Sequence, residues 1–67
     1  MSVARATEIS ATSEQSFEEA IRQGLERATR SLRGVTSVWI KERRVKLRDG
    51  QIAEYQVNLQ VTFVLED

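Results

Sequence analysis

The C-terminal part of the chain alternates apolar and polar side chains from Tyr55 to Leu65. Every odd position of this segment is apolar, and the even positions up to residue 62 are Gln56, Asn58, Gln60 and Thr62. Alternation with a period of two residues is typical of a β-strand that buries one face. The segment therefore predicts a strand whose other face carries amides and a hydroxyl.

A second pattern, with spacings of three and four residues, predicts a helix from Thr12 to Gly34. Its apolar stripe contains Phe17, Ala20, Ile21, Leu25, Ala28 and Leu32, with Gly24 on the same side. Thr12 and Gln15 form a capping box that would begin the helix, and Gly34 is the expected C′ residue. Gly24 weakens a helix, so its place in the stripe indicates close approach to a sheet.

Two further strands complete the predicted fold. β-branched residues from Val3 to Ser10 predict a weak first strand, and Val35 to Arg48 predict a second strand that ends at the hairpin signal Asp49-Gly50. A right-handed crossover makes these two strands parallel, with the last strand between them and antiparallel to both. We expect an α+β fold of β-α-β-β order, in which a three-stranded sheet of order 1-3-2 packs on one helix. Residues 1–67 would form this single domain.

The turn at Asp49-Gly50 also predicts a register for the hairpin. The expected cross-strand pairs are Val38–Val61, Ile40–Leu59, Trp39–Gln60, Ser37–Thr62, Lys41–Asn58 and Arg43–Gln56. This register places Trp39 on the polar face, away from the helix. Because Val45 and Leu47 fall out of phase with Val38 and Ile40, we expect a β-bulge near residues 42–44.

Composition limits the chemistry that the chain can perform. The chain has 67 residues with no cysteine and no histidine, so a disulfide, a zinc finger and a histidine-activated nucleophile are excluded. The glycines at 24, 34 and 50 do not form a phosphate-binding loop. We therefore expect a protein that is not an enzyme. Because so short a chain has a marginal core, oligomerisation is the expected source of further buried area.

Ten basic and ten acidic residues give a formal net charge of zero, which argues against a nucleic-acid partner. The sequence has no apolar run of membrane-spanning length and no apolar core of a signal peptide near its start. We expect a soluble cytoplasmic protein that binds neither nucleic acid nor membrane.

The polar face carries the candidate binding groups, each with a simpler alternative. Trp39 is suited to stacking on a ligand or to packing between subunits, and the second is the simpler interpretation. The amides from Gln56 to Gln60 are suited to reading the edge of a planar ligand, or form a solvated sheet face. The basic segment from Lys41 to Arg48 is suited to binding an anion, or forms ion pairs with the acidic residues Glu54, Glu66 and Asp67. No acidic spacing predicts a metal site.

These residues also resemble a known family. The motifs Thr12-Ser13-Glu14, Phe17-Glu18-Glu19-Ala20, Arg27-Ala28 and Leu32-Arg33 resemble the helix of the dodecins. The motifs Asp49-Gly50, Glu54-Tyr55-Gln56-Val57 and Leu65-Glu66-Asp67, with Val61 and Phe63, resemble their turn and last strand. The resemblance implies a hollow homododecamer that stores or buffers riboflavin or FMN between its subunits.

The resemblance also implies roles for individual residues. The glutamine that bonds the flavin edge matches Gln56, and an arginine of the second strand matches Arg44. The position of the stacking tryptophan falls on Ser37, whereas Trp39 lies two residues later on the same face. We expect Trp39 to stack, Gln56 to bond the ring edge, and Arg44 or Arg43 to meet the ribityl or phosphate end. The alternative is a dodecin-like oligomer without flavin, which forms a structural shell or binds a metal or small anion.

Overall fold

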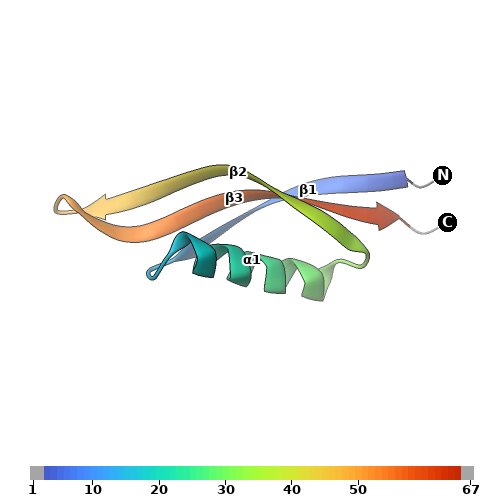
Figure 1. Ribbon diagram of the computed structural model, residues 1–67, viewed down its shortest axis with the longest axis horizontal. Coiled ribbons are helices and arrows are strands. Elements are labelled where there is room, and N and C mark those ends of the chain that lie inside the picture. The colour runs from blue at the N-terminus through green and yellow to red at the C-terminus, as the bar shows by residue number, and fades with distance from the viewer. Residues whose placement is uncertain (1–2, 66–67) are drawn as a thin grey trace.

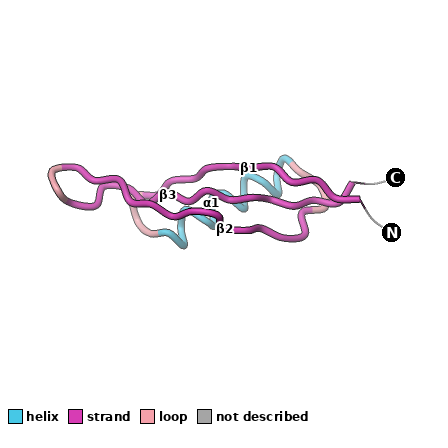
Figure 2. The backbone as a smooth tube through the Cα atoms, turned by 90° about the horizontal axis from the view of Figure 1, so that it is seen from above, coloured by secondary structure: helices cyan, strands magenta, loops and turns pink. Residues whose placement is uncertain are grey.

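The computed structural model describes residues 3–65, which form one three-stranded sheet and one helix. The elements are β1 (Val3–Ser13), α1 (Phe17–Ser31), β2 (Val35–Arg48) and β3 (Gln51–Leu65). Both β1 and β2 pair with β3 in antiparallel fashion, so β3 is central (Figures 1 and 2). The predicted α+β fold with sheet order 1-3-2 is confirmed.

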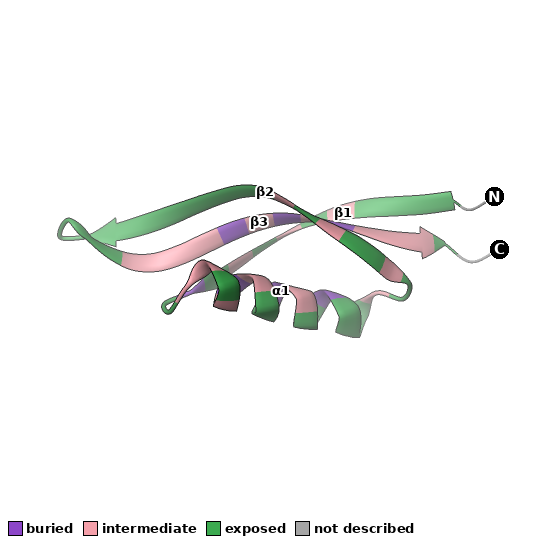
Figure 3. Cartoon of the chain, in the orientation of Figure 1, coloured by how far each residue is buried: buried purple, intermediate pink, exposed green. Residues whose placement is uncertain are grey.

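The core lies between α1 and the odd-numbered face of β3. Val57, Leu59 and Val61 are fully buried, Ala20 of the helix packs with the first two, and Ala28 is 5% exposed. Figure 3 shows buried stretches on β3 and along α1, while most of β2 is exposed. The alternation along the last strand therefore predicted the core face correctly.

The helix approaches the sheet most closely at Gly24. A Cβ atom added there would lie 3.0 Å from Leu59 Cδ1 and 3.3 Å from the Cβ of Ala11. Both distances are shorter than ordinary contacts between carbon atoms, which are about 3.5–4.0 Å. The predicted close approach is confirmed, and it explains why a weak helix former occupies this position.

The helix begins later than the sequence predicted. Ser16 is the N-cap, and its Oγ accepts a hydrogen bond of 3.0 Å from the Glu19 backbone N–H. Thr12, the predicted cap, lies in β1 opposite Gln56. The chain offers two capping signals in succession, and the second is used because backbone pairing with β3 extends β1 to Ser13. The first strand is correspondingly longer than the predicted segment Val3 to Ser10.

The helix also ends earlier than predicted. Leu32 is the C-cap, and its N–H donates to the Ala28 carbonyl at 2.8 Å. Gly34 therefore lies beyond the C′ position, with a φ angle of +70°. A side chain at Gly34 would crowd the Val64 carbonyl at 3.1 Å, and the Val64 N–H donates to the Gly34 carbonyl at 3.0 Å. The positive φ angle of Gly34 is therefore needed where the chain enters β2, and not at the end of the helix.

The hairpin turn is at Asp49-Gly50, as predicted. Their φ angles are 53° and 76°, the signs that a two-residue type I′ turn requires. Arg48 pairs with Gln51, so β3 begins at Gln51, earlier than the predicted Tyr55.

The predicted register is correct next to the turn and at residues 37–40, and it is wrong in the segment between two register shifts. The first four expected pairs, those of residues 37–40, are confirmed. The register then shifts between Ile40 and Glu42, which confirms a bulge and places it at Lys41, next to the predicted range. Beyond it, Glu42 pairs with Asn58, so the predicted pairs Lys41–Asn58 and Arg43–Gln56 are wrong. Counted from the turn, the displacement begins between Leu47 and Lys46, where Ala53 is an extra residue of β3, and it ends at Lys41, the extra residue of β2.

The helix cap provides a direct test of the corrected boundary. We expect Ser16→Ala to lower the free energy of unfolding by about 1 kcal/mol, because the Glu19 N–H loses its acceptor. Thr12→Ala should cost less than about 0.5 kcal/mol, since Thr12 caps nothing. Urea denaturation followed by circular dichroism measures both, and an equal loss in the two variants would contradict the observed cap.

The first turns of α1 also predict a pH effect. Hydrogen bonds from the Arg22 guanidinium, and then from Gln23, lower the pKa of Glu19 from 4.5 to about 2. Because the folded pKa is the lower one, the stabilisation is complete above pH 4.5 and is lost as the pH falls towards 2. In Arg22→Gln the pKa of Glu19 should return towards 4.5, as NMR titration of its carboxyl group would show. A Glu19 pKa that stays near 2 in this variant would exclude Arg22 as the cause.

Candidate functional site

The side of the sheet that faces away from α1, here called the open face, carries the even-numbered residues of β3. Its central row is formed by Gln56, Asn58, Gln60 and Thr62. Within residues 3–65, no element packs over this row (Figure 1). The open face is therefore a polar surface that the subunit itself leaves uncovered.

Trp39 lies on the open face opposite Gln60, with 63% of its surface exposed. Lys41 Nζ lies 5.7 Å from the centroid of the indole ring. The same ammonium lies 2.8 Å from Glu8 Oε1 on β1, so the bulged Lys41 reaches across the central strand. The predicted placement of the tryptophan is confirmed, and a cation lies beside it.

A chain of hydrogen bonds crosses all three strands near the other end of the open face. Gln56 Nε2 donates to Ser10 Oγ at 3.1 Å and to Asn58 Oδ1 at 3.2 Å. Asn58 Nδ2 in turn donates to Glu42 Oε1 at 2.8 Å. Sequence reasoning did not find Ser10 or Glu42, because the bulge decides which β2 residue faces Asn58. The amides of Gln56 and Asn58 are therefore held by hydrogen bonds within the subunit.

Two cations of β2 beyond the bulge, Arg44 and Lys46, are partnered by carboxylates. Arg44 lies opposite Gln56, and its Nη2 is 3.8 Å from Glu42 Oε2. Lys46 Nζ is 3.8 Å from Glu54 Oε1, which agrees with the predicted ion pairing to Glu54. The other two predicted acidic partners, residues 66 and 67, lie outside the described residues. Exposed pairs at this distance are weak, so an incoming anion can compete for Arg44.

Arg43 lies on the opposite side of the sheet from the other predicted site residues. It pairs with Val57, and its guanidinium carbon lies 5.6 Å from the centroid of the Phe17 ring. The expectation that Arg43 joins Gln56 at the site is wrong. The physical reason is the extra residue at Lys41, because a shift of one residue turns every following side chain to the other face.

The predicted residues of the open face form two separate groups. Arg44 and Gln56 are direct cross-strand neighbours, and Ser37 lies opposite Thr62 beyond Trp39. Trp39 and Gln56 are displaced along the sheet by four residues of β3, which is roughly 13 Å. A flat ligand would have to extend along the open face to meet both residues in one subunit, or be shared between two subunits.

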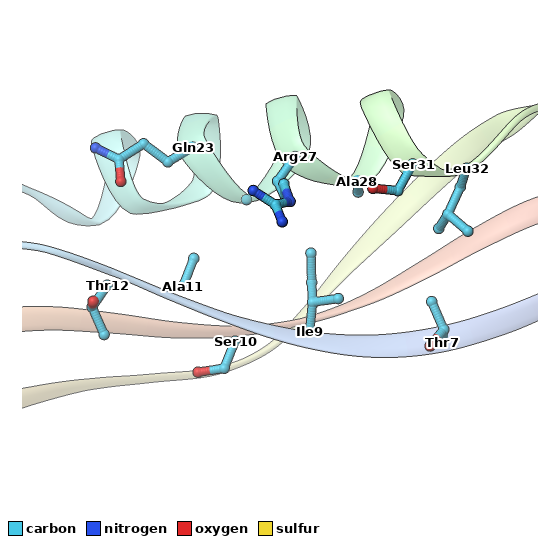
Figure 4. Close-up of a pocket in the computed structure, with 11 residues that line it drawn as sticks. Thr7, Ile9, Ser10, Ala11, Thr12, Gln23, Arg27, Ala28, Ser31 and Leu32 are labelled. Atoms are coloured by element: carbon cyan, nitrogen blue, oxygen red, sulfur yellow. The ribbon is translucent and has the colours of Figure 1, made fainter.

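A groove lies on the other side of the sheet, between α1 and β1 (Figure 4). Its volume is about 590 Å³, and its lining includes Ile9, Ala11, Gly24 and Leu32. The Arg27 side chain reaches from α1 into the space above β1 (Figure 4). The sequence did not predict this groove, and it contains none of the predicted site residues.

Residues 3–65 contain no cluster of three acidic side chains arranged to hold a metal ion. The described helix α1 lacks the length and apolar character that crossing a membrane requires.

The fold and open face together define a small β-α-β-β protein with one sheet face buried by its helix and one left uncovered. The sequence profile of the Dodecin family matches residues 3–66, and the chain belongs to the dodecin family. It is 38% identical over 65 residues to the dodecin of Thermus thermophilus, with 97% of this chain and 94% of that protein covered.

Solved structures agree with this assignment. The dodecin from Streptomyces davaonensis is 38% identical, with a TM-score of 0.91 over 98% of this chain and 97% of that chain. The dodecin from Streptomyces coelicolor is 33% identical, with a TM-score of 0.91 over 98% and 94% of the two chains. The family and the fold are therefore established together.

The two adjacent arginines should respond differently to substitution. We expect Arg43→Gln to lower the free energy of unfolding by about 0.5–1 kcal/mol, because its contact with the Phe17 ring is lost. Arg44→Gln should cost less than about 0.5 kcal/mol, since its ion pair is exposed and long. Chemical denaturation compares the two, and a larger loss in Arg44→Gln would contradict their placement on opposite faces.

Proposed function

We propose that this chain forms a cytoplasmic homododecamer that stores riboflavin or FMN between its subunits. The isoalloxazine ring would lie on the open face of the sheet. The protein would hold the flavin without converting it, because the open face offers amides, hydroxyls and ion pairs but no nucleophile paired with a base. Membership of the dodecin family supports this function.

The observation that carries the proposal is the exposed indole of Trp39 on the open face. An aromatic side chain of this size usually finds an apolar or aromatic partner, whereas Trp39 is 63% exposed and its ring contact among residues 3–65 is with the Lys41 ammonium. A flavin ring is a planar aromatic partner with a polar edge, and the amides of β3 lie on the same face to meet that edge. A stacking residue beside a row of amides suits a planar aromatic ligand with a polar edge better than it suits a ligand without an aromatic ring.

Each predicted residue of the open face takes a role in this proposal. Trp39 stacks on the ring, and Gln56 bonds its polar edge. Arg44, beside Gln56, meets the ribityl or phosphate end. Ser37 adjoins Trp39 with a small side chain that leaves room for the ring. Arg43 takes no part, because it lies on the helix side.

Assembly into an oligomer follows from the exposed apolar surface at the hairpin end. Val45, Leu47 and Ile52 are 39%, 62% and 54% exposed and belong to the β2–β3 hairpin. The turn end of this hairpin projects beyond α1 (Figure 1). A chain of 67 residues with so small a core gains stability by burying this surface against further copies.

The alternative function is a dodecin-like shell without flavin, or a shell that binds a metal or small anion. The observation in its favour is Ser37, which occupies the position where the family resemblance implies the stacking ring. The ion pairs of Arg44 and Lys41 add to it, because these cations are already partnered. In this case Trp39 would be buried between subunits and inaccessible to ligands.

A titration with riboflavin separates the two functions. Trp39 is the only tryptophan, so its fluorescence should be quenched as flavin binds at micromolar concentration. Trp39→Leu should weaken binding by about tenfold, as judged by the flavin's own fluorescence, because stacking is lost. Arg43→Ala serves as the control, since it changes a nearby cation on the wrong face.

Native mass measurement of the same samples reports the number of subunits. A colourless preparation whose tryptophan emission stays constant at micromolar riboflavin would favour the shell without flavin. A stable monomer would contradict the proposed assembly in either form.

A further inference from the structure

The hydrogen-bonded chain on the open face has a direction that is set at Glu42. A carboxylate can only accept hydrogen bonds, so the Asn58 amide must turn its Nδ2 towards Glu42, where it lies 2.8 Å from Oε1. The second carboxylate oxygen of Glu42 lies 3.8 Å from Arg44 Nη2.

The orientation of Asn58 decides that of Gln56. With Nδ2 committed to Glu42, Asn58 Oδ1 lies 3.2 Å from the Gln56 amide, and only the Nε2 end can meet it without opposing two oxygens. The second hydrogen of Nε2 is taken by Ser10 Oγ at 3.1 Å. Ser10 can donate or accept, so it does not fix the direction; the acceptor-only group at the other end does.

The atom left for a ligand is therefore Gln56 Oε1. Both hydrogens of Nε2 are used within the subunit, and no donor from residues 3–65 bonds the carbonyl oxygen. An amide alone could present either a donor or an acceptor. The network restricts this amide to an acceptor.

We propose that Glu42 is a positioning residue that makes Gln56 present an acceptor, so that the site takes planar ligands with an N–H at their polar edge. In an isoalloxazine this group is the imide N3–H between two carbonyls. The inference rests on the proposed function. It adds that Gln56 presents a hydrogen-bond acceptor, which the identity of Gln56 alone does not decide. A ligand whose edge lacks that N–H leaves Gln56 Oε1 without a partner once the ring covers it.

Riboflavin and 3-methylriboflavin test this polarity, because the methyl group replaces the N3 hydrogen and leaves the ring otherwise unchanged. We expect 3-methylriboflavin to bind the unmodified protein about tenfold more weakly, or worse, in a fluorescence titration. In Glu42→Lys a donor replaces the acceptor, Asn58 and Gln56 both reverse, and Nε2 faces the ligand. The ratio of the two dissociation constants should then fall below about threefold.

The matched control is Glu54→Lys, which makes the same charge change on the open face outside the network. It should keep the full ratio. If Glu42→Lys does not fold, Asn58→Leu breaks the same chain while keeping a similar volume, and it should also reduce the ratio to below about threefold.

The outcomes separate this inference from the proposed function. Failure of both flavins to bind the unmodified protein would overturn the proposed function and the inference with it. Equal binding of both flavins would overturn the inference alone. A ratio that stays near tenfold in Glu42→Lys or Asn58→Leu would show that the methyl group is excluded by size, and would also overturn the role of Glu42.

Discussion

Pairing of β3 along both of its edges is the constraint on which the rest of the structure depends. Because residues 55–63 of β3 are paired on both edges, with β1 and with β2, their side chains alternate between two faces. The odd face, with Val57, Leu59 and Val61, meets α1 and forms the core. The even face has no cover within residues 3–65. A single central strand thus separates the core from the uncovered polar face.

The bulge at Lys41 decides what the open face contains. The extra residue turns Arg43 towards the helix, where it contacts Phe17, and brings Glu42 opposite Asn58. Lys41 itself crosses the central strand to Glu8 and lies beside the Trp39 ring. The one-residue bulge therefore places the Glu42 carboxylate beside Asn58 on the open face, and it turns Arg43 away from that face.

The small core and the uncovered polar face are two consequences of the same geometry. One helix can bury only one side of a three-stranded sheet, and α1 is shorter than the hairpin that projects beyond it (Figure 1). The exposed Trp39 and the apolar hairpin end are surfaces that further copies or a flat ligand would cover. In the proposed homododecamer both surfaces would be covered, because a ligand held between subunits would share surface that no single subunit buries.

The sequence by itself determined the order of elements, the turn at Asp49-Gly50, the core face of β3 and the position of Trp39, because these follow from local periodicity and turn chemistry. It placed the start of the helix at Thr12, since two capping signals follow one another and only pairing with β3 selects Ser16. It predicted a bulge but not the residue that forms it. Because each residue of register exchanges the two faces of a strand, only the tertiary structure decided that Arg43 leaves the open face and that Glu42 orients its amides.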